Sequence, residues 1–113
     1  MGRYLSLDMG AESGRLVLVE ISQEAISTEV IYRFETPVIE DELGRRCWNF
    51  PKIVEEIVHS LSLAAPRGPF DSLGVDTWGL DFGLLDENQK LVSLPVSHRD
   101  HQQMVILRRH PRL

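Results

Sequence analysis

A short glycine-rich segment near the N-terminus carries residue types suited to holding a phosphate group. Asp8 is followed by Gly10 and Gly14, with a hydroxyl at Ser13 and a cation at Arg15. Glycines let backbone amides converge on an anion, a strand-end carboxylate can hold Mg²⁺ through water, and Ser or Arg side chains donate to phosphoryl oxygens. An ordinary glycine-rich hairpin has the same composition, so the spacing alone leaves both interpretations open.

Two common nucleotide-binding loops do not fit this segment. The Rossmann pattern needs a third glycine and a following helix, whereas Gly14 is followed by the β-prone run 16–19. The P-loop needs Gly-Lys-Ser or Gly-Lys-Thr, and neither tripeptide occurs in the chain. Any phosphate loop here must therefore connect two strands.

The elements on either side of the segment are expected to be strands. Residues 3–7 alternate polar and apolar side chains, and residues 15–21 are rich in Val, Ile and Leu. The loop 10–14 is short enough to join them as an antiparallel hairpin. Alternation over residues 25–35 predicts a third strand, which Pro37 ends.

An amphipathic helix follows. Its apolar residues fall at helical spacing, with Asn49 as the expected N-cap and the Pro66-Gly68-Pro69 cluster as the stop. The predicted apolar stripe consists of Phe50, Ile53, Val54, Ile57, Val58 and Leu61.

More strands are predicted after the helix, at residues 72–76, 82–85 and 91–96. Residues 39–46 are charged and contain Gly44, which predicts a solvated loop. Its acidic residues 40–42 are expected on a solvent-exposed surface. An order of strands, then a helix, then a further strand is typical of a mixed α/β fold. In such a fold the helix carries the chain back over the sheet as a crossover connection.

Composition narrows the class of protein. The 113 residues correspond to one domain of common size, and 42% apolar with 26% charged residues indicates a globular protein. A net charge of -5 argues against nucleic acid and anionic membranes as partners, and no apolar run is long enough to span a bilayer. Cys47 is the single cysteine, so we expect a buried, idle thiol in a reducing compartment, the cytoplasm.

Three segments together resemble the FGGY family of carbohydrate kinases, and most closely its rhamnulokinase subgroup. Residues 8–15, Asp-Met-Gly-Ala-Glu-Ser-Gly-Arg, resemble the N-terminal signature of that family. Residues 73–86, which contain Gly-Val-Asp-Thr-Trp-Gly-Leu-Asp-Phe, are similar to the stretch at the acceptor-sugar site. Residues 94–100 match the place where these enzymes continue from strand to helix. The order and spacing agree across residues 4–100.

The resemblance implies an α/β fold of the ribonuclease H-like (actin-like ATPase) type, with strand-strand-strand-helix-strand order in an incomplete domain. Residues 1–100 would form the N-terminal part of the first kinase domain, and residues 101–113 a divergent tail. The cofactors would be ATP and Mg²⁺. The ATP-binding loop would include Gly10, Ala11, Glu12, Ser13, Gly14 and Arg15, with Asp8 near the Mg²⁺ and the phosphates. Related loops often have Ser or Thr where this chain has Glu12, whose charge would repel a phosphate.

By the same resemblance, Gly79 would lie at the ketose. A glycine keeps no side chain between a sugar and the backbone, and Trp78 offers a flat apolar face to ring carbons. Asp76 and Asp81 would accept hydrogen bonds from sugar hydroxyls. Trp78 and Phe82 also suit a hydrophobic core, and Asp76 also suits a turn.

The expected parent reaction is ATP-dependent phosphorylation of a ketose such as L-rhamnulose. The family places its catalytic base much further along the chain, beyond Leu113, so none is expected here and the isolated chain is expected to be inactive. The alternatives are a non-catalytic nucleotide-binding or interaction module, with self-association through an exposed core, and another FGGY kinase such as a xylulokinase or fuculokinase.

Overall fold

The computed structural model describes residues 1–100, which fall into two compact units. The first consists of Met1–Thr36 and Ile53–Trp78, and the second of Pro37–Lys52 and the chain from Gly79 onward. The predicted tail, residues 101–113, lies outside the described residues, so a boundary at residue 100 stays a prediction.

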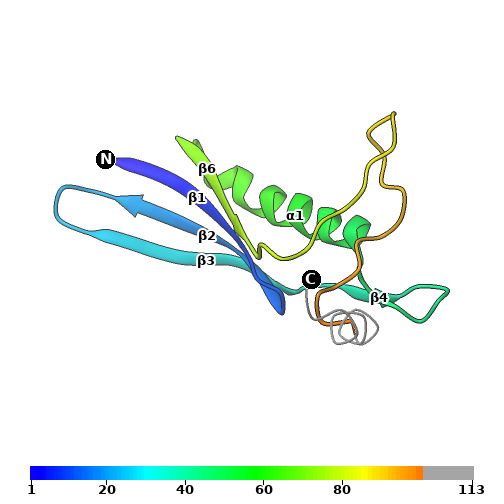
Figure 1. The fold of residues 1–113 in the computed structure, drawn as a ribbon. Helices are drawn as coiled ribbons and strands as arrows, with labels where there is room; N and C mark the ends of the chain where they lie inside the picture. Colours follow the sequence, from blue (N-terminus) through cyan, green and yellow to red (C-terminus); the bar gives the residue numbers. More distant parts are fainter. Residues whose placement is uncertain (101–113) are drawn as a thin grey trace. The chain divides into compact units, whose positions relative to one another are not determined.

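The first unit is built on a four-stranded sheet in the order β3-β2-β1-β6. Its strands are β1 (Gly2–Met9), β2 (Ser13–Ile21), β3 (Ile26–Glu35) and β6 (Ser72–Thr77), drawn side by side in Figure 1. β2 is antiparallel to both β1 and β3, whereas β6 runs parallel to β1. A parallel neighbour requires a crossover, and the helix α1 (Phe50–Ala64) lies in that connection. The predicted strand and helix order is confirmed in this unit.

One face of this sheet carries the core of the unit. Side chains that share the face are brought together by the strand register, which pairs Leu7 with Leu16 and Leu16 with Tyr32. The helix packs on this face, because the Tyr32 hydroxyl donates to Glu56 Oε2 at 2.7 Å and the Tyr32 ring meets His59 edge-on at 4.9 Å. The buried apolar side chains of the three strands β1 to β3 are Leu5, Leu7, Met9, Leu16, Leu18 and Phe34.

The helix forms where it was predicted, with one difference in packing. Asn49 Oδ1 accepts a 3.3 Å hydrogen bond from the Lys52 amide, as expected of an N-cap. Ile53 is buried, but Val54 and Val58 on the predicted apolar stripe are 41% and 60% exposed. Only part of the predicted stripe is therefore buried among the described residues. No helix within residues 1–100 is long and apolar enough to cross a membrane.

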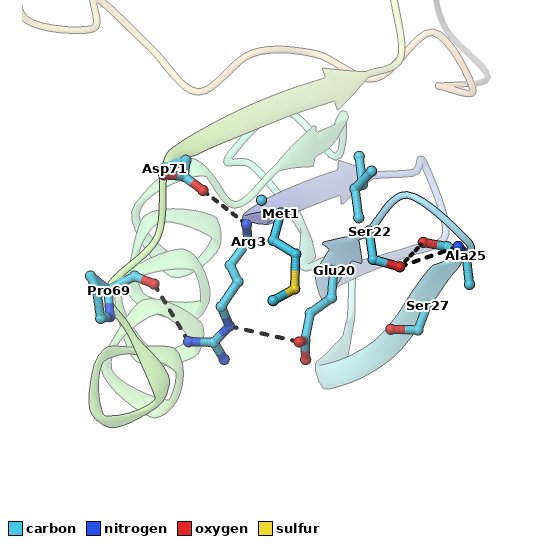
Figure 2. A pocket seen from close by; sticks show the side chains of 10 residues that line it. Met1, Arg3, Glu20, Ser22, Ala25, Ser27, Pro69 and Asp71 are labelled. Carbon is cyan, nitrogen blue, oxygen red and sulfur yellow. Dashed lines mark hydrogen bonds and ion pairs between the residues drawn. The ribbon is translucent and has the colours of Figure 1, made fainter.

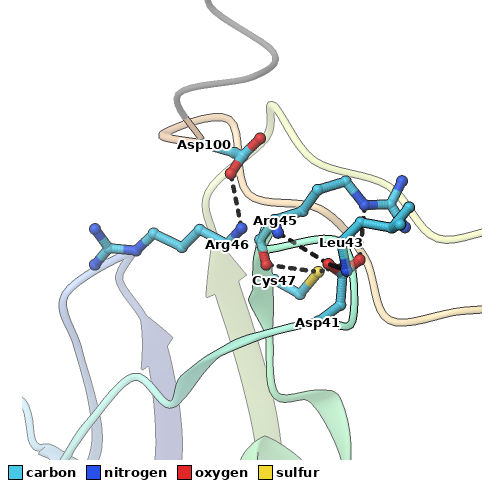
Figure 3. Close-up of polar contacts among 6 residues, drawn as sticks. All are labelled: Asp41, Leu43, Arg45, Arg46, Cys47 and Asp100. Atoms are coloured by element: carbon cyan, nitrogen blue, oxygen red, sulfur yellow. Dashed lines mark hydrogen bonds and ion pairs between the residues drawn. The ribbon is translucent and has the colours of Figure 1, made fainter.

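The second unit contains a small hairpin where a solvated loop was predicted. β4 (Val38–Glu40) pairs with β5 (Arg46–Trp48), so the prediction for residues 39–46 is wrong at both ends. The connection is shaped by Asp41, as Figure 3 shows: its carboxylate accepts from the Leu43 and Arg45 amides and lies 2.6 Å from Arg45 Nε. Asp41 is half-buried for this reason, and its structural role separates it from its exposed acidic neighbours.

The two strands predicted at residues 82–85 and 91–96 are also wrong. These segments make only isolated bridges, Leu85 with Leu91 and Cys47 with Val96. The turn between them closes on the Asp86 side chain, which accepts from the amides of Asn88 and Lys90. Local side-chain bonds of this kind compete with a ladder. The segment 97–100 is a turn anchored by Asp100, whose carboxylate accepts the Arg46 amide at 2.7 Å.

Cys47 lies inside the second unit, as predicted. Its side chain is 1% exposed, and its Sγ is 3.8 Å from Asp41 Oδ2 (Figure 3). Burial, reinforced by the nearby Asp41 charge, raises the pKa of the Cys47 thiol. The thiol is therefore held in its neutral, unreactive form.

Candidate functional site

The glycine-rich segment is the turn of the β1–β2 hairpin. Asp8 and Arg15 are direct cross-strand partners, and Arg15 Nε donates to Asp8 Oδ2 at 3.0 Å. Both side chains are well exposed, so this pair contributes at most about 1 kcal/mol and separates at little cost. β1 runs on to Met9, which places Asp8 just inside the strand.

The two glycines of the turn are needed for close approach. A Cβ on Gly10 would lie 2.8 Å from the Ser13 carbonyl oxygen, and a Cβ on Gly14 would lie 2.4 Å from Phe34 Cζ. The only glycine of residues 1–100 with a positive φ is Gly44. Close packing gives a structural reason for both glycines, and the convergence of their amides on a phosphate stays a prediction.

Thr36, which follows β3, holds the turn from outside, and sequence reasoning missed it. Its hydroxyl donates to the Gly10 carbonyl at 2.6 Å, and its amide donates to the Glu12 carbonyl at 2.9 Å. The residue is 7% exposed. The available signal was a single hydroxyl between a strand and Pro37, which does not indicate a partner 26 positions earlier. Among the loop residues, Glu12 and Ser13 are exposed and Ala11 is half-buried.

The parallel pairing of β1 with β6 brings Asp76 beside Asp8. The two residues are direct register partners, so their backbones are about 4.8 Å apart and both side chains leave the same face of the sheet. Arg15 shares this face, because it is also a register partner of Asp8. This cluster, which we call the acidic pair with Arg15, lies on the face opposite Leu7. The sequence had placed Asp8 and Asp76 at different subsites.

The acidic pair suits one role of Mg²⁺ in nucleotide sites. Mg²⁺ is commonly bound by one or two carboxylates together with water and substrate phosphates. Within residues 1–100, no group of three or more metal-binding side chains occurs. Asp8 and Asp76 therefore supply two carboxylates of the kind that Mg²⁺ takes from proteins.

The segment after β6 is exposed to solvent at Gly79, the residue expected to lie near the sugar. Gly79 is exposed, and a Cβ placed on it would meet nothing within 4 Å. Trp78 is half-buried, whereas Phe82 is 76% exposed, so a core role for Phe82 is wrong. An exposed glycine with free space around it leaves its backbone accessible.

Asp81 is the anchor of this segment within the second unit. Its Oδ2 accepts the Trp48 indole N–H at 2.6 Å and lies 2.8 Å from His98 Nδ1, while the side chain is only 8% exposed. Trp48 is itself buried. Sequence reasoning gave neither Trp48 nor His98 a part in the site. The carboxylate ties the segment that follows Gly79 to Trp48 and His98.

A cavity of about 230 Å³ lies beside this anchor in the second unit. Its lining is mainly the apolar segments 80–84 and 93–96, with Asp81 and Arg45 as the charged groups. An apolar wall with a few polar groups is the usual composition of a small-molecule site.

A larger cavity, about 420 Å³, lies at the far end of the β1–β2 pair from the hairpin turn (Figure 2). Its polar groups already have partners: the Arg3 backbone amide donates to Asp71 Oδ2 at 2.9 Å, and Arg3 Nε is 4.0 Å from Glu20 Oε2. The Arg3 guanidinium also stacks over Phe70 at 5.3 Å. These contacts fix the start of β1, and none of the sequence-predicted site residues lines this cavity.

No protein-family model matches the chain. Curated rhamnulokinases do: the chain is 38% identical over 100 residues to that of Mannheimia succiniciproducens and 41% identical over 102 residues to that of Halalkalibacterium halodurans. These matches cover 86% and 88% of the chain but only 20% and 21% of the relatives, so the chain spans about a fifth of their length.

Solved structures agree on the fold. A ligand-bound xylulose kinase from Lactobacillus acidophilus matches 99% of the chain and 23% of its own, with a TM-score of 0.78 at 13% identity. A gluconate kinase from the same organism matches 97% of the chain and 22% of its own, with a TM-score of 0.77 at 13% identity. The expected mixed α/β fold of the ribonuclease H-like type is thereby confirmed, and the chain is similar in sequence to a segment that makes up about a fifth of the rhamnulokinases.

Proposed function

We propose that the chain supplies the phosphate loop and the acceptor segment of an FGGY carbohydrate kinase that phosphorylates a ketose such as L-rhamnulose in the cytoplasm. The observation that carries the proposal is the acidic pair with Arg15, which lies beside the turn that connects β1 and β2. The chain that contains it is 38% identical to a rhamnulokinase over 100 residues. The fold likeness to sugar kinases supports the same assignment.

The hairpin would hold the phosphates of ATP. In this proposal Arg15 turns from Asp8 to a phosphoryl oxygen, which the exposure of the pair allows. The turn from Gly10 to Gly14 lies along the phosphates, with Ser13 as an exposed donor. Asp8 and Asp76 would hold Mg²⁺ through water, and the bound metal would neutralise phosphate charge. The same neutralisation would offset the repulsion from Glu12.

The segment 78–82 would meet the sugar. Gly79 offers accessible backbone, and Trp78 offers an indole face. Asp81 holds this segment in place through its bonds to Trp48 and His98, so we assign it mainly to positioning. The 230 Å³ cavity is large enough for a group of a few heavy atoms beside Asp81.

We assign no catalytic base to residues 1–100. Asp8 and Asp76 are proposed for the metal, and Asp81 Oδ2 already accepts two hydrogen bonds. The purified chain is therefore expected to bind Mg·ATP without forming sugar phosphate. A xylulokinase or fuculokinase activity of a longer parent would be separated from a rhamnulokinase activity by comparing the acceptor sugars that it phosphorylates.

The test is ligand-dependent thermal unfolding of the purified chain with millimolar Mg·ATP. At a ligand concentration ten times Kd, linkage adds about 1.4 kcal/mol, which corresponds to a rise in Tm of roughly 5 °C for a domain of this size. Asp8→Asn and Asp76→Asn should each abolish the Mg²⁺-dependent part of the rise. Glu40→Gln removes an equal charge from an exposed strand position and is the matched control.

If Mg·ATP leaves the Tm of the unsubstituted 113-residue chain unchanged, the phosphate-loop assignment is wrong and a non-catalytic interaction module is the better description. A rise that Asp8→Asn and Glu40→Gln both retain would remove the metal role of Asp8. Formation of rhamnulose phosphate by the chain alone, absent in Asp8→Asn, would contradict the expected inactivity.

A further inference from the structure

The 230 Å³ cavity of the second unit begins one residue after Gly79, because Leu80 is part of its lining. Pockets that enclose a whole small molecule usually measure about 300–1,000 Å³. This cavity therefore fits one end of a sugar and not all of it. A sugar that lies along the accessible backbone of Gly79 could place that end in the cavity.

Most side chains around this cavity are apolar, and several of them are exposed. Leu80 and Leu84 are 75% and 64% exposed, and Phe82 is 76% exposed. Covering such surface with an apolar group is favourable, whereas a hydroxyl gains little from it. Six of the ten lining residues are apolar: Leu80, Phe82, Leu84, Leu94, Pro95 and Val96.

The charged residues of the lining are already held by other groups. Arg45 Nε donates to Asp41 Oδ2 at 2.6 Å. Asp81 Oδ2 accepts the Trp48 indole N–H, also at 2.6 Å. Ser93 supplies the one side-chain hydroxyl among the lining residues. A hydroxyl that entered this cavity would therefore give up its bonds to water for few replacements, which lowers affinity.

We infer that this cavity binds the methyl end of a 6-deoxyketose and favours such a sugar over the ketose with a hydroxyl at C6. The inference rests on the proposed function, which places an acceptor ketose at Gly79. L-Rhamnulose is 6-deoxy-L-fructose, so these two sugars differ only by the hydroxyl at C6. In the complex, the C6 methyl of L-rhamnulose contacts the side chains of Leu84 and Val96.

The size of the preference follows from the composition of the cavity. A hydrophobic pocket distinguishes a methyl group from its hydroxylated counterpart by about 10–100-fold. Arg45 and Ser93 in the same lining offer a hydroxyl some compensation. We therefore expect the lower end of that range, about a tenfold preference for L-rhamnulose over L-fructose.

The first test is saturation-transfer difference NMR of the 113-residue chain with millimolar L-rhamnulose. The method detects ligand protons that contact the protein, and it works at weak affinity. The methyl protons at C6 should receive more saturation than the protons at C1. In competition, L-fructose should need about ten times the concentration of L-rhamnulose to halve the signal of a bound reference sugar.

The second test changes the polarity of the cavity without changing its shape. Val96→Thr places a hydroxyl in the lining. It should reduce the preference for L-rhamnulose from about tenfold to about threefold or less, because the C6 hydroxyl of L-fructose gains a partner. Val92→Thr is the matched control, at a 64% exposed position outside the lining, and should keep the preference of the unsubstituted chain. Circular dichroism verifies that both variants are folded.

The outcomes separate this inference from the proposed function. A rise in Tm with Mg·ATP, together with no saturation of either sugar, would overturn the inference and keep the phosphate-loop assignment. Equal competition by the two sugars, or equal saturation at C6 and C1, would also overturn it. If Val96→Thr keeps the preference, or if Val92→Thr loses it, this cavity is not the methyl site. If neither Mg·ATP nor a sugar binds, the proposed function is wrong and the inference fails with it.

Discussion

The contact between Gly14 and Phe34 gives the sharpest stability prediction. Alanine at position 14 would place its Cβ 2.4 Å from Phe34 Cζ and within 3 Å of both neighbouring ring carbons. Carbon atoms normally stay about 3.5–4.0 Å apart, so the ring must move by about 1 Å. Phe34 is 7% exposed and has little room to do so. We expect Gly14→Ala to lower the free energy of unfolding by about 1–3 kcal/mol, the usual cost of overpacking.

The assay is urea unfolding followed by far-ultraviolet circular dichroism. Gly74→Ala is the matched control, because that Cβ meets nothing, and removing a strand glycine should leave stability equal or up to about 1 kcal/mol higher. Phe34→Leu should remove most of the Gly14→Ala cost in a double-mutant cycle, since a smaller side chain leaves space. If Gly14→Ala and Gly74→Ala are equally stable, or if Phe34→Leu gives no relief, the packing account of Gly14 is wrong.

Three further predictions concern single side chains. Thr36→Val should cost about 1–3 kcal/mol by leaving the Gly10 carbonyl without its donor, whereas Thr36→Ser should cost much less; urea unfolding distinguishes them. Hydrogen bonds from the Arg45 backbone, and more weakly from its side chain, lower the pKa of Asp41 below its ordinary 3.8, so its contribution is present above that pH and is lost as pH falls through the folded pKa. Asp41→Asn should therefore show a shallower loss of stability on acidification than the parent, measured as Tm against pH. Cys47 should react slowly with iodoacetamide in the native chain and rapidly in urea, because its thiol is 1% exposed and burial raises its pKa; equal rates would contradict this.

The strands and helix of the first unit were predictable because their patterns are long and regular. β1, β2, β3 and α1 each have at least eight residues, enough for a period to be read. The second unit depends on short ladders and on side chains that close turns, such as Asp41 and Asp86. Three-residue strands carry no readable period, so the sequence predicts a loop over residues 39–46, which overlaps parts of β4 and β5.

The roles of the candidate-site residues stay predictions, and the sequence indicates only part of their grouping in space. The hairpin from Asp8 to Arg15 forms as expected, but its glycines are explained by packing. The pairing of Asp8 with Asp76 needed the parallel register of β6, which follows from the crossover and not from local sequence. The bonds of Asp81 to Trp48 and His98 span 33 and 17 positions, and no spacing rule indicates them.

The two hydrogen bonds from Thr36 also set an order of events during folding. The turn contains a bond from the Gly10 amide to the Ser13 carbonyl, which can form as soon as the hairpin closes. The bonds from Thr36 to Gly10 and Glu12 need β3 to be paired with β2 first. A β1–β2 hairpin that forms before β3 would therefore lack the bonds that fix the conformation of its loop. The loop would take its final shape only when the chain had been made and folded through Thr36, about a third of its length.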